Sequence, residues 1–414
     1  MSIGNDQQAM LLKTDHTALA LCFCVAIVEG LDLQAAGLTV APIRAQLGLS
    51  LAETTSFLTA GTIGLFFGAL AGGRISDFFS RRTVLLISVA LFGLFSILTA
   101  YSTGPYLLFF ARLLTGIGIG GALPNLVSLV AESASGDARK RAVAWMFAGV
   151  PLGGALASLI FMRVGAERWH AVYYCGGLLP LLLVPLLWLG LPHQLPRPAL
   201  GPAIGSTIRS TRTLPALFGG DRIVTTPLLW LAFCLMQLVS HLLLNWLPTL
   251  MAGRGFGGGG AALIQISYGL IGSLGCGMIG VLFRYLDARV VGAVAASWLI
   301  AMLIILPLAD GLAGMALLTG LASAGMMSCL VVNYAAAPLA YPAEVRGTGV
   351  GAAVAIGRLG SIVGPILGGF LIGDHGSLGA VLVVIVPLIA IGALCSGIAI
   401  RRAEQQDGDP HPAR

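Results

Sequence analysis

The sequence predicts an all-α membrane protein with twelve transmembrane helices arranged as two six-helix halves. Hydrophobic residues make up 57% of the 414 positions and charged residues only 10%, whereas soluble domains average about 45–50% and about 25%. Apolar stretches continue for roughly 20 residues, the length that a helix needs to cross a hydrocarbon core of about 30 Å. A membrane β-barrel would show short segments of alternating hydrophobicity instead.

Six apolar stretches precede a polar break and six follow it. The predicted N-terminal half, residues 1–191, has spans at 17–41, 53–73, 83–101, 105–131, 139–164 and 170–191. Residues 192–225 hold five prolines and four arginines, a composition that predicts a cytoplasmic linker. The predicted C-terminal half, residues 226–414, has spans at 226–252, 260–284, 288–308, 311–334, 345–372 and 377–400 and a short tail.

Positive charges predict the orientation. Of the 23 lysines and arginines, 17 fall in segments on the side of the two termini, 4 fall on the other side, and Arg112 and Arg358 lie within spans. Because cytoplasmic loops carry an excess of lysine and arginine, both termini are predicted to be cytoplasmic. Attraction of these basic segments to anionic lipid at the cytoplasmic surface explains the net charge of +6. We therefore expect no nucleic-acid partner.

The sequence gives little support for a secreted protein, a disulfide-bonded or metal-binding protein, or an enzyme. The first 16 residues are polar and the first apolar stretch is of full spanning length, so we expect no cleaved signal peptide. All seven cysteines fall within predicted spans without a C-x-x-C pair, which argues against disulfides or a metal site. A phosphate-binding loop and a recognisable nucleophile with its base are missing from the sequence. We therefore expect neither an enzyme nor a cofactor.

Four charged residues lie inside predicted spans: Glu29, Asp32, Arg112 and Arg358. Together they would cost about 10–14 kcal/mol in lipid, so they must face a partner or a hydrated chamber. A buried carboxylate can carry a proton, and an arginine can meet an anion or modulate that carboxylate. We expect Asp32 to bind the proton and Glu29 to tune it. The alternative is a pair of salt bridges that only fix helix packing.

The loop after the second span offers a conformational latch. Asp77 lies close to Arg81 and Arg82, and these residues are suited to breakable ion pairs with Glu132 and the basic cluster 139–141. Such pairs would stabilise one conformation. Simple positive-inside topology is the alternative interpretation.

These motifs resemble the major facilitator superfamily over essentially the whole chain. Its loop pattern G-x-x-x-D-[RK]-x-G-R-[RK] is matched at Gly73, Asp77, Arg81 and Arg82, with departures at Phe78 and Ser80. The Arg112–Gly121 segment resembles an arginine and glycine motif that the superfamily associates with proton coupling. The resemblance implies the major facilitator fold, a monomer, and alternating access around a midplane site.

Within that superfamily the chain resembles the aromatic acid:H+ symporters, most closely the branch that carries 3-(3-hydroxyphenyl)propionate. The resemblance rests on the segments 29–37, 245–248, 344–351 and 357–360. Glu29 departs from the usual aspartate. By position, the resemblance implies that transport needs Glu29, Asp32, Arg112, Glu132, Arg346 and Arg358.

A cavity for an aromatic acid should offer rings, a cation and a few hydrogen-bonding groups. In the seventh span, His241 and Asn245 share a helix face and Trp246 follows, although a packing role for His241 and an interfacial position for Trp246 are alternatives. The predicted substrate-binding residues are Gln34, Asn125, His241, Asn245, Trp246, Asn333 and Tyr334, with Gln265 and Tyr268 as further polar candidates.

The resemblance therefore predicts proton-coupled uptake of a small aromatic acid, such as a hydroxyphenylpropionate or hydroxybenzoate-like anion, across a bacterial inner membrane. If Asp32 couples the proton, Asp32→Asn abolishes uphill uptake, and full accumulation by that variant would contradict the role. Two alternatives stay open. A drug or metabolite efflux antiporter is suggested by glycine–proline patterns at 149–154 and 364–369, and a membrane sensor is disfavoured by the short tail.

Overall fold

The computed structural model describes residues 16–133, 136–191, 217–219, 222–283, 285–341, 346–372 and 378–408. Among them are twelve helices that are long and apolar enough to cross a membrane, and no strand. The fold class predicted from the sequence is confirmed. The first six helices are α2 (His16–Leu47), α3 (Leu51–Phe78), α4 (Arg81–Ala100), α5 (Pro105–Glu132), α6 (Gly136–Val164) and α7 (His170–Gly190).

The other six are α9 (Arg222–Gly253), α10 (Gly258–Leu282), α11 (Ala288–Ile305), α12 (Gly311–Ala336), α13 (Arg346–Ile372) and α14 (Leu378–Gly408). Short 3-10 turns lie at Ala166–Arg168, Leu306–Leu308 and Ala337–Ala340. Every helix begins within four residues of its predicted span. Most of the predicted linker lies outside the described residues, and its last four positions, 222–225, already belong to α9.

Helix starts follow local capping rules. At α3, the Ser50 hydroxyl accepts a hydrogen bond from the Glu53 backbone amide at 3.2 Å, and the Glu53 carboxylate accepts from the Ser50 amide at 2.8 Å. This reciprocal capping box satisfies two amides that the helix itself leaves unpaired. At α4, Ser80 caps the amide of Thr83 at 3.1 Å. Helix α5 begins with Pro105, whose missing N–H costs nothing at that position.

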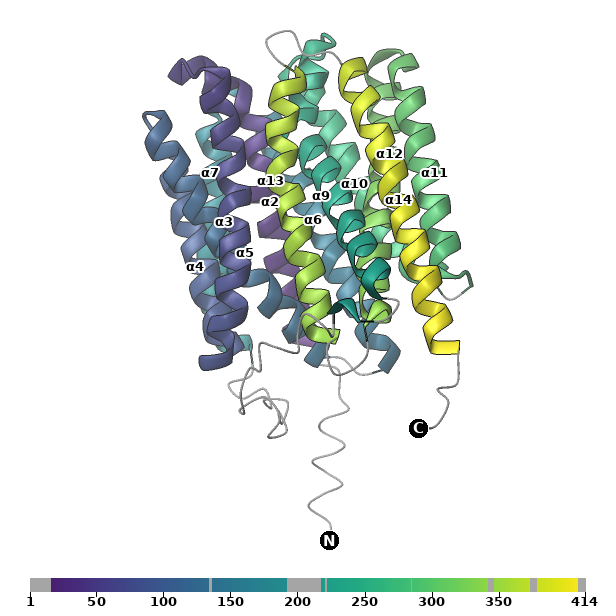
Figure 1. Ribbon diagram of the computed structural model, residues 1–414. Coiled ribbons are helices and arrows are strands. Elements are labelled where there is room, and N and C mark those ends of the chain that lie inside the picture. The colour runs from purple at the N-terminus through teal and green to yellow at the C-terminus, as the bar shows by residue number, and fades with distance from the viewer. Residues whose placement is uncertain are drawn as a thin grey trace.

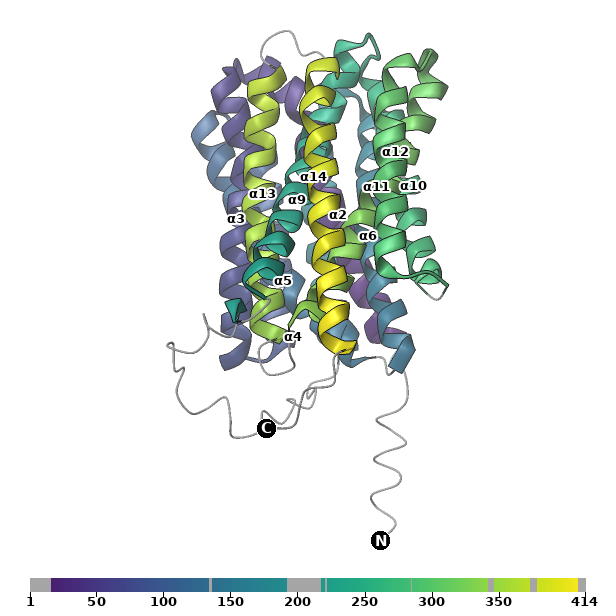
Figure 2. The same ribbon diagram turned by 45° about the vertical axis from the view of Figure 1, so that its right-hand side comes forward.

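The helices stand side by side with α3, α4, α5 and α7 on one flank and α11, α12 and α14 on the other (Figure 1). Helix α13 lies beside α3, and α10 lies beside α6, so each half contacts the other along these helices (Figure 2). Helix α2 also packs on α9. The two halves therefore meet along a central interface formed by α2, α3 and α6 on one side and α9, α10 and α13 on the other.

The apolar core is distributed unequally along the membrane axis. We call the end where α2 begins and α14 ends the terminal end, and the other the opposite end. At the opposite end, a single cluster joins both halves and includes Leu38, Tyr173, Leu243 and Met315. At the terminal end, the described residues form separate clusters, one in the first half and two in the second. The halves are thus closed together at the opposite end.

Candidate functional site

One group of polar residues, the paired cluster, lies inside the first half and consists of Asp32, Ser96, Arg112 and Tyr173. Arg112 Nη1 donates to Asp32 Oδ2 at 2.7 Å, and Ser96 Oγ donates to Asp32 Oδ1 at 2.7 Å. Both carboxylate oxygens of Asp32 therefore have a donor. The Asp32 side chain is fully buried and Arg112 is 3% exposed. A charged aspartate is well compensated in such a site.

Tyr173 of α7 supports this ion pair from the other side. The Arg112 guanidinium lies 5.7 Å from the centre of the Tyr173 ring, within the range of a cation–π contact. Thr39 donates its hydroxyl proton to the Ala35 carbonyl at 2.7 Å. Its oxygen, 2.9 Å from the Tyr173 hydroxyl, must then accept from that hydroxyl. Four helices, α2, α4, α5 and α7, thus hold Asp32 and Arg112 in one geometry.

A second group, the interface cluster, lies between the halves and consists of Glu29, His241 and Arg358. Glu29 is fully buried, and neither of its carboxylate oxygens has a hydrogen-bond partner among the described residues. Arg358 of α13 lies near enough for its charge to act on both Glu29 and His241. Its Nε atom is buried without a partner. The cluster therefore places an acid without a hydrogen-bond partner, from the first half, within range of the charge of an arginine from the second half.

The two carboxylates of α2 thus have different surroundings. Asp32 accepts hydrogen bonds from Arg112 and Ser96, whereas Glu29 faces the other half without a hydrogen-bond donor. Of the two expected surroundings, a partner or a hydrated chamber, Asp32 has the partner, and neither carboxylate faces a chamber in this conformation because both are 0% exposed. Packing of α6 closes over α2: a Cβ atom on Gly30 would overlap the Val150 carbonyl oxygen. Water reaches these groups only if the halves move apart.

The predicted residues of α9 all lie in the interior. His241 Nδ1 is 3.1 Å from the Gln237 carbonyl, so Nδ1 carries the proton in the neutral ring and Nε2 is left as an acceptor. Asn245 donates to the His241 carbonyl at 2.8 Å. Trp246 is 2% exposed and donates to the Pro365 carbonyl at 2.9 Å. Trp246 therefore joins α9 to α13 and is not an exposed interfacial residue.

Gln34 and Asn125 lie in different environments. Gln34 Nε2 donates to the Leu244 carbonyl at 3.2 Å, which links α2 to α9 across the halves. Asn125 donates to the Gly121 carbonyl at 2.9 Å and to the Gly72 carbonyl at 3.5 Å. Gln34 is thus at the central interface, whereas Asn125 joins α5 to α3 within the first half.

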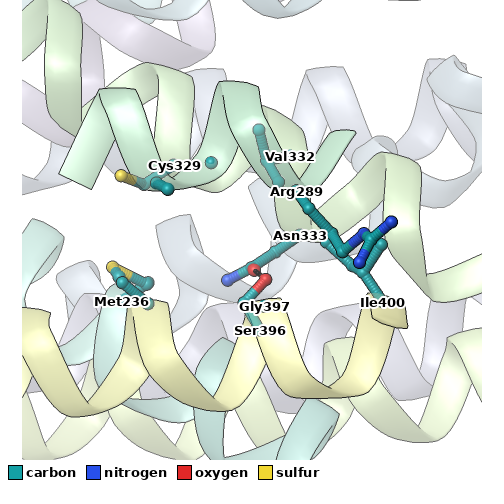
Figure 3. A pocket seen from close by; sticks show the side chains of 11 residues that line it. Met236, Arg289, Cys329, Val332, Asn333, Ser396, Gly397 and Ile400 are labelled. Atoms are coloured by element: carbon teal, nitrogen blue, oxygen red, sulfur yellow. Dashed lines mark hydrogen bonds between the residues drawn. The ribbon is translucent and has the colours of Figure 1, made fainter. Parts of the chain in front are cut away.

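Asn333 and Tyr334 are neighbours in sequence but point to different places. Asn333 accepts from the Ser396 hydroxyl at 2.7 Å and lines a cavity of about 50 Å³ among α9, α11, α12 and α14. Figure 3 shows Asn333 and Ser396 in this cavity with Met236 and Cys329. The cavity lies within the second half, away from α2. Tyr334 instead contacts Phe147 of the first half.

The predicted latch falls largely outside the described side chains. Asp77, Glu132 and Arg346 have a described backbone, at helix ends, but their side chains are not described. Arg82 is buried and donates to the Trp188 carbonyl, with its guanidinium 5.9 Å from the Trp188 ring. Arg82 thus attaches α4 to α7, and Arg81 is the first residue of α4. The latch stays a prediction.

Sequence reasoning missed two partners of the buried charges and underrated a third residue. Ser96 and Tyr173 share the third and sixth spans with other polar residues, such as Ser88 and Tyr174, so nothing in the sequence singled them out. Gln265 is 2% exposed, and both polar atoms of its amide have no partner among the described residues. It lies one turn before Gly269, where a Cβ atom would overlap the Pro151 carbonyl. Gln265 therefore faces α6 across the interface.

Comparisons with known proteins agree with this architecture. The sequence profile described as "Major Facilitator Superfamily" matches residues 22–337. The chain is 39% identical to the 3-(3-hydroxy-phenyl)propionate transporter of Escherichia coli, with 92% of each chain covered. It is 33% identical to the gallate transporter of Pseudomonas putida, covering 92% of this chain and 90% of that one.

Among solved structures, the fold is similar to that of a D-xylose-proton symporter. The TM-score is 0.75 over 94% of this chain and 97% of the other, at 18% identity. This likeness concerns the fold alone.

Proposed function

The chain belongs to the Major Facilitator Superfamily, and from that premise we propose that it carries an aromatic carboxylic acid inward together with a proton. The substrate class is suggested by the relatives that carry hydroxyphenylpropionate and gallate. The observation that supports coupling is the buried carboxylate of Glu29, which has no hydrogen-bond partner among the described residues and lies within range of the charge of Arg358 from the other half. The proposed location is a bacterial inner membrane with both termini in the cytoplasm.

Arg358 is the proposed clamp for the carboxylate of the cargo. An arginine guanidinium matches a carboxylate with two parallel hydrogen bonds. Arg358 lies at the interface of the halves, where the midplane site of this superfamily is expected. Arg112 is less suited, because its guanidinium is already bonded to Asp32 at 2.7 Å.

Glu29 is the proposed proton carrier, with Asp32 positioning Arg112. A buried carboxylate without any hydrogen-bond donor is far more costly charged than neutral. Glu29 meets that description and Asp32 does not. This assignment differs from the expectation that Asp32 binds the proton and Glu29 tunes it.

Competition for the charge of Arg358 then couples the two fluxes. In the empty protein, once the halves have moved apart and water reaches the cluster, Glu29 is ionised and its charge balances that of Arg358. When the cargo carboxylate binds Arg358, Glu29 loses its counter-charge and takes up a proton. Both the empty and the fully loaded clusters are neutral, whereas cargo without a proton leaves one uncompensated negative charge. One proton accompanies each monoanion, so the cycle is electroneutral and driven by the pH gradient.

We rank the efflux alternative lower, because helix packing also explains its two motifs. The two glycine–proline patterns that suggested an antiporter lie at close helix contacts. A Cβ atom on Gly153 would overlap the Ile27 carbonyl of α2, and one on Gly364 would overlap the Leu238 carbonyl of α9. Small residues at those positions let helix backbones approach.

The test is uptake of labelled aromatic acids by proteoliposomes containing wild-type protein or Glu29→Gln. A glutamine imitates protonated Glu29 permanently, so we expect Glu29→Gln to lose uphill, pH-driven accumulation while cargo-for-cargo counterflow continues. Glu167→Gln, which alters an exposed carboxylate, is the matched control and should behave as wild type. Accumulation by Glu29→Gln at the wild-type level would refute the coupling role, and wild-type protein that moves no aromatic acid would refute the substrate class.

A further inference from the structure

Three aromatic side chains meet at the central interface. The ring of Phe147, from α6, stacks on Tyr334, from α12, with centroids 5.5 Å apart and planes inclined by 28°. Phe233, from α9, meets Tyr334 edge-on at 5.2 Å and 87°. Phe147 belongs to the first half, and the other two belong to the second. Phe147 and Tyr334 are only partly buried.

These rings lie beside the interface cluster on its terminal side. On the second half, Gly357 packs against Phe233, with a Cβ position 3.4 Å from that side chain, and the next residue is Arg358. On the first half, Val150 is at the level of Gly30, the neighbour of Glu29. Phe147 precedes Val150 by three residues, or about 4.5 Å along the helix. The ring stack is therefore about one helical turn from the charged residues.

That separation suits one class of cargo. In an arylpropionate, two methylene carbons separate the carboxylate from the ring, which is a length comparable to the ~5.4 Å pitch of a helix. A cargo whose carboxylate is bound to Arg358 would place its ring at the level of Tyr334. Offset-stacked rings are a favourable geometry for any pair of aromatic groups. The aromatic ring of a cargo molecule can thus stack on Tyr334 in the same way as Phe147 does.

We infer that the face of Tyr334 is the subsite for the aromatic ring of the cargo, and that Phe147 occupies this subsite when no cargo is bound. The inference rests on the proposed function and adds the ring to it. Phe233 is a positioning residue, because its edge-on contact fixes the Tyr334 ring plane.

The exchange has a mechanical consequence. Phe147 and Tyr334 connect the two halves at a level where their apolar cores are separate. A cargo ring that replaces Phe147 on Tyr334 removes this connection and releases the halves at the terminal end. An aliphatic acid of the same length binds Arg358 but displaces Phe147 poorly. Ring recognition and opening are then a single event.

The experiment compares Phe147→Ala, Tyr334→Phe and Tyr334→Leu in proteoliposome counterflow. The cargoes are 3-phenylpropionate and its saturated analogue 3-cyclohexylpropionate. Removing the competitor in Phe147→Ala should lower the KM for the aryl acid by roughly threefold to tenfold, the range expected for one aromatic pair. The KM for the cyclohexyl acid should not change. Phe110→Ala removes one ring of an α5 pair on an exposed surface and is the matched control.

The tyrosine variants test the subsite from the other side. Tyr334→Leu should raise the KM for the aryl acid and abolish the preference for it over the cyclohexyl acid, whereas Tyr334→Phe keeps a ring and should retain that preference. If Tyr334→Leu does not fold, Phe147→Ala and Tyr334→Phe carry the test. Aryl-acid transport with unchanged KM values in Phe147→Ala overturns the ring subsite and leaves the proposed function intact. Wild-type protein that transports neither acid overturns both.

Discussion

The charge of Arg358 has two counter-ions in the proposed cycle, the carboxylate of Glu29 and the carboxylate of the cargo. In that cycle both compete for one guanidinium, which forms no ion pair with a carboxylate among the described residues in this conformation. Because this competition involves only a few side chains, single substitutions can test it.

Replacing Arg358 should impair cargo binding in a graded way. Arg358→Lys keeps the charge but loses the planar fork that fits a carboxylate, so the KM for counterflow should rise roughly tenfold. Arg358→Gln should abolish both counterflow and net uptake. The comparison is Arg289→Gln, which breaks an exposed ion pair with Glu404 and should leave transport unchanged. Normal counterflow by Arg358→Gln would assign the cargo carboxylate to another group.

Substitution of Asp32 should lower the stability of the folded protein more than substitution of Glu29. Breaking a buried ion pair by removing one partner costs about 3–5 kcal/mol, because the remaining charge stays buried and unpaired. Asp32→Asn leaves Arg112 in that state and should lower the melting temperature, and Asp32→Asn with Arg112→Gln should recover part of the loss. Melting is measured in detergent with a thiol-reactive dye, since Cys22, Cys276 and Cys329 are buried until unfolding. A wild-type melting temperature for Asp32→Asn would contradict the structural role.

The sequence could predict the four intramembrane charges but not how they pair. Their cost in lipid follows from residue type alone. Their pairing depends on the rotation of each helix and on Ser96, Tyr173 and Thr39, whose contacts involve other spans. Asn333 shows the same limit: a polar residue near mid-span was predicted to bind cargo, yet it faces Ser396 within the second half.

At the scale of helices, α2 is positioned by backbone contact with α6. Cβ atoms on Gly30 and Gly153 would overlap the carbonyl oxygens of Val150 and Ile27 respectively. The two helices therefore approach as closely as glycine permits, which brings Glu29 to the interface. The helix spans themselves were predicted well, because hydropathy and length determine them locally.

A bulky residue at this crossing should separate the two helices. Gly153→Leu is expected to lower the melting temperature and to abolish counterflow, since no shift of a flexible side chain can relieve an overlap with backbone. Gly277→Leu is the control, because a Cβ atom there meets nothing within 4 Å. A variant Gly153→Leu with wild-type stability and transport would show that α2 and α6 separate readily.

At the scale of the whole molecule, the proposed orientation requires the halves to part at the opposite end for incoming cargo to reach Glu29 and Arg358. Thr55 of α3 and Gly369 of α13 face each other there, and a Cβ atom on Gly369 would lie 3.4 Å from Thr55 Cβ. That spacing is close to the roughly 3.5–4.5 Å that a disulfide requires.

A cross-link at this point should stop the cycle. Thr55→Cys with Gly369→Cys is expected to lose uptake under oxidising conditions and to regain it on reduction. Each single variant, treated with the same oxidant, controls for the seven native cysteines. Full uptake by the oxidised double variant, with the cross-link verified by mass spectrometry, would show that these helices need not separate.

The shared core at the opposite end also sets a resting preference before any cargo arrives. Cargo that arrives from the opposite end can bind only to protein molecules that are open at that end. The apparent affinity for the cargo is therefore reduced in proportion to the fraction of open protein. If about one molecule in a hundred is open, the measured affinity is about a hundredfold below the intrinsic one. Leucine-to-alanine substitutions in that core should therefore increase the open fraction and raise the apparent affinity for cargo, although they do not contact it.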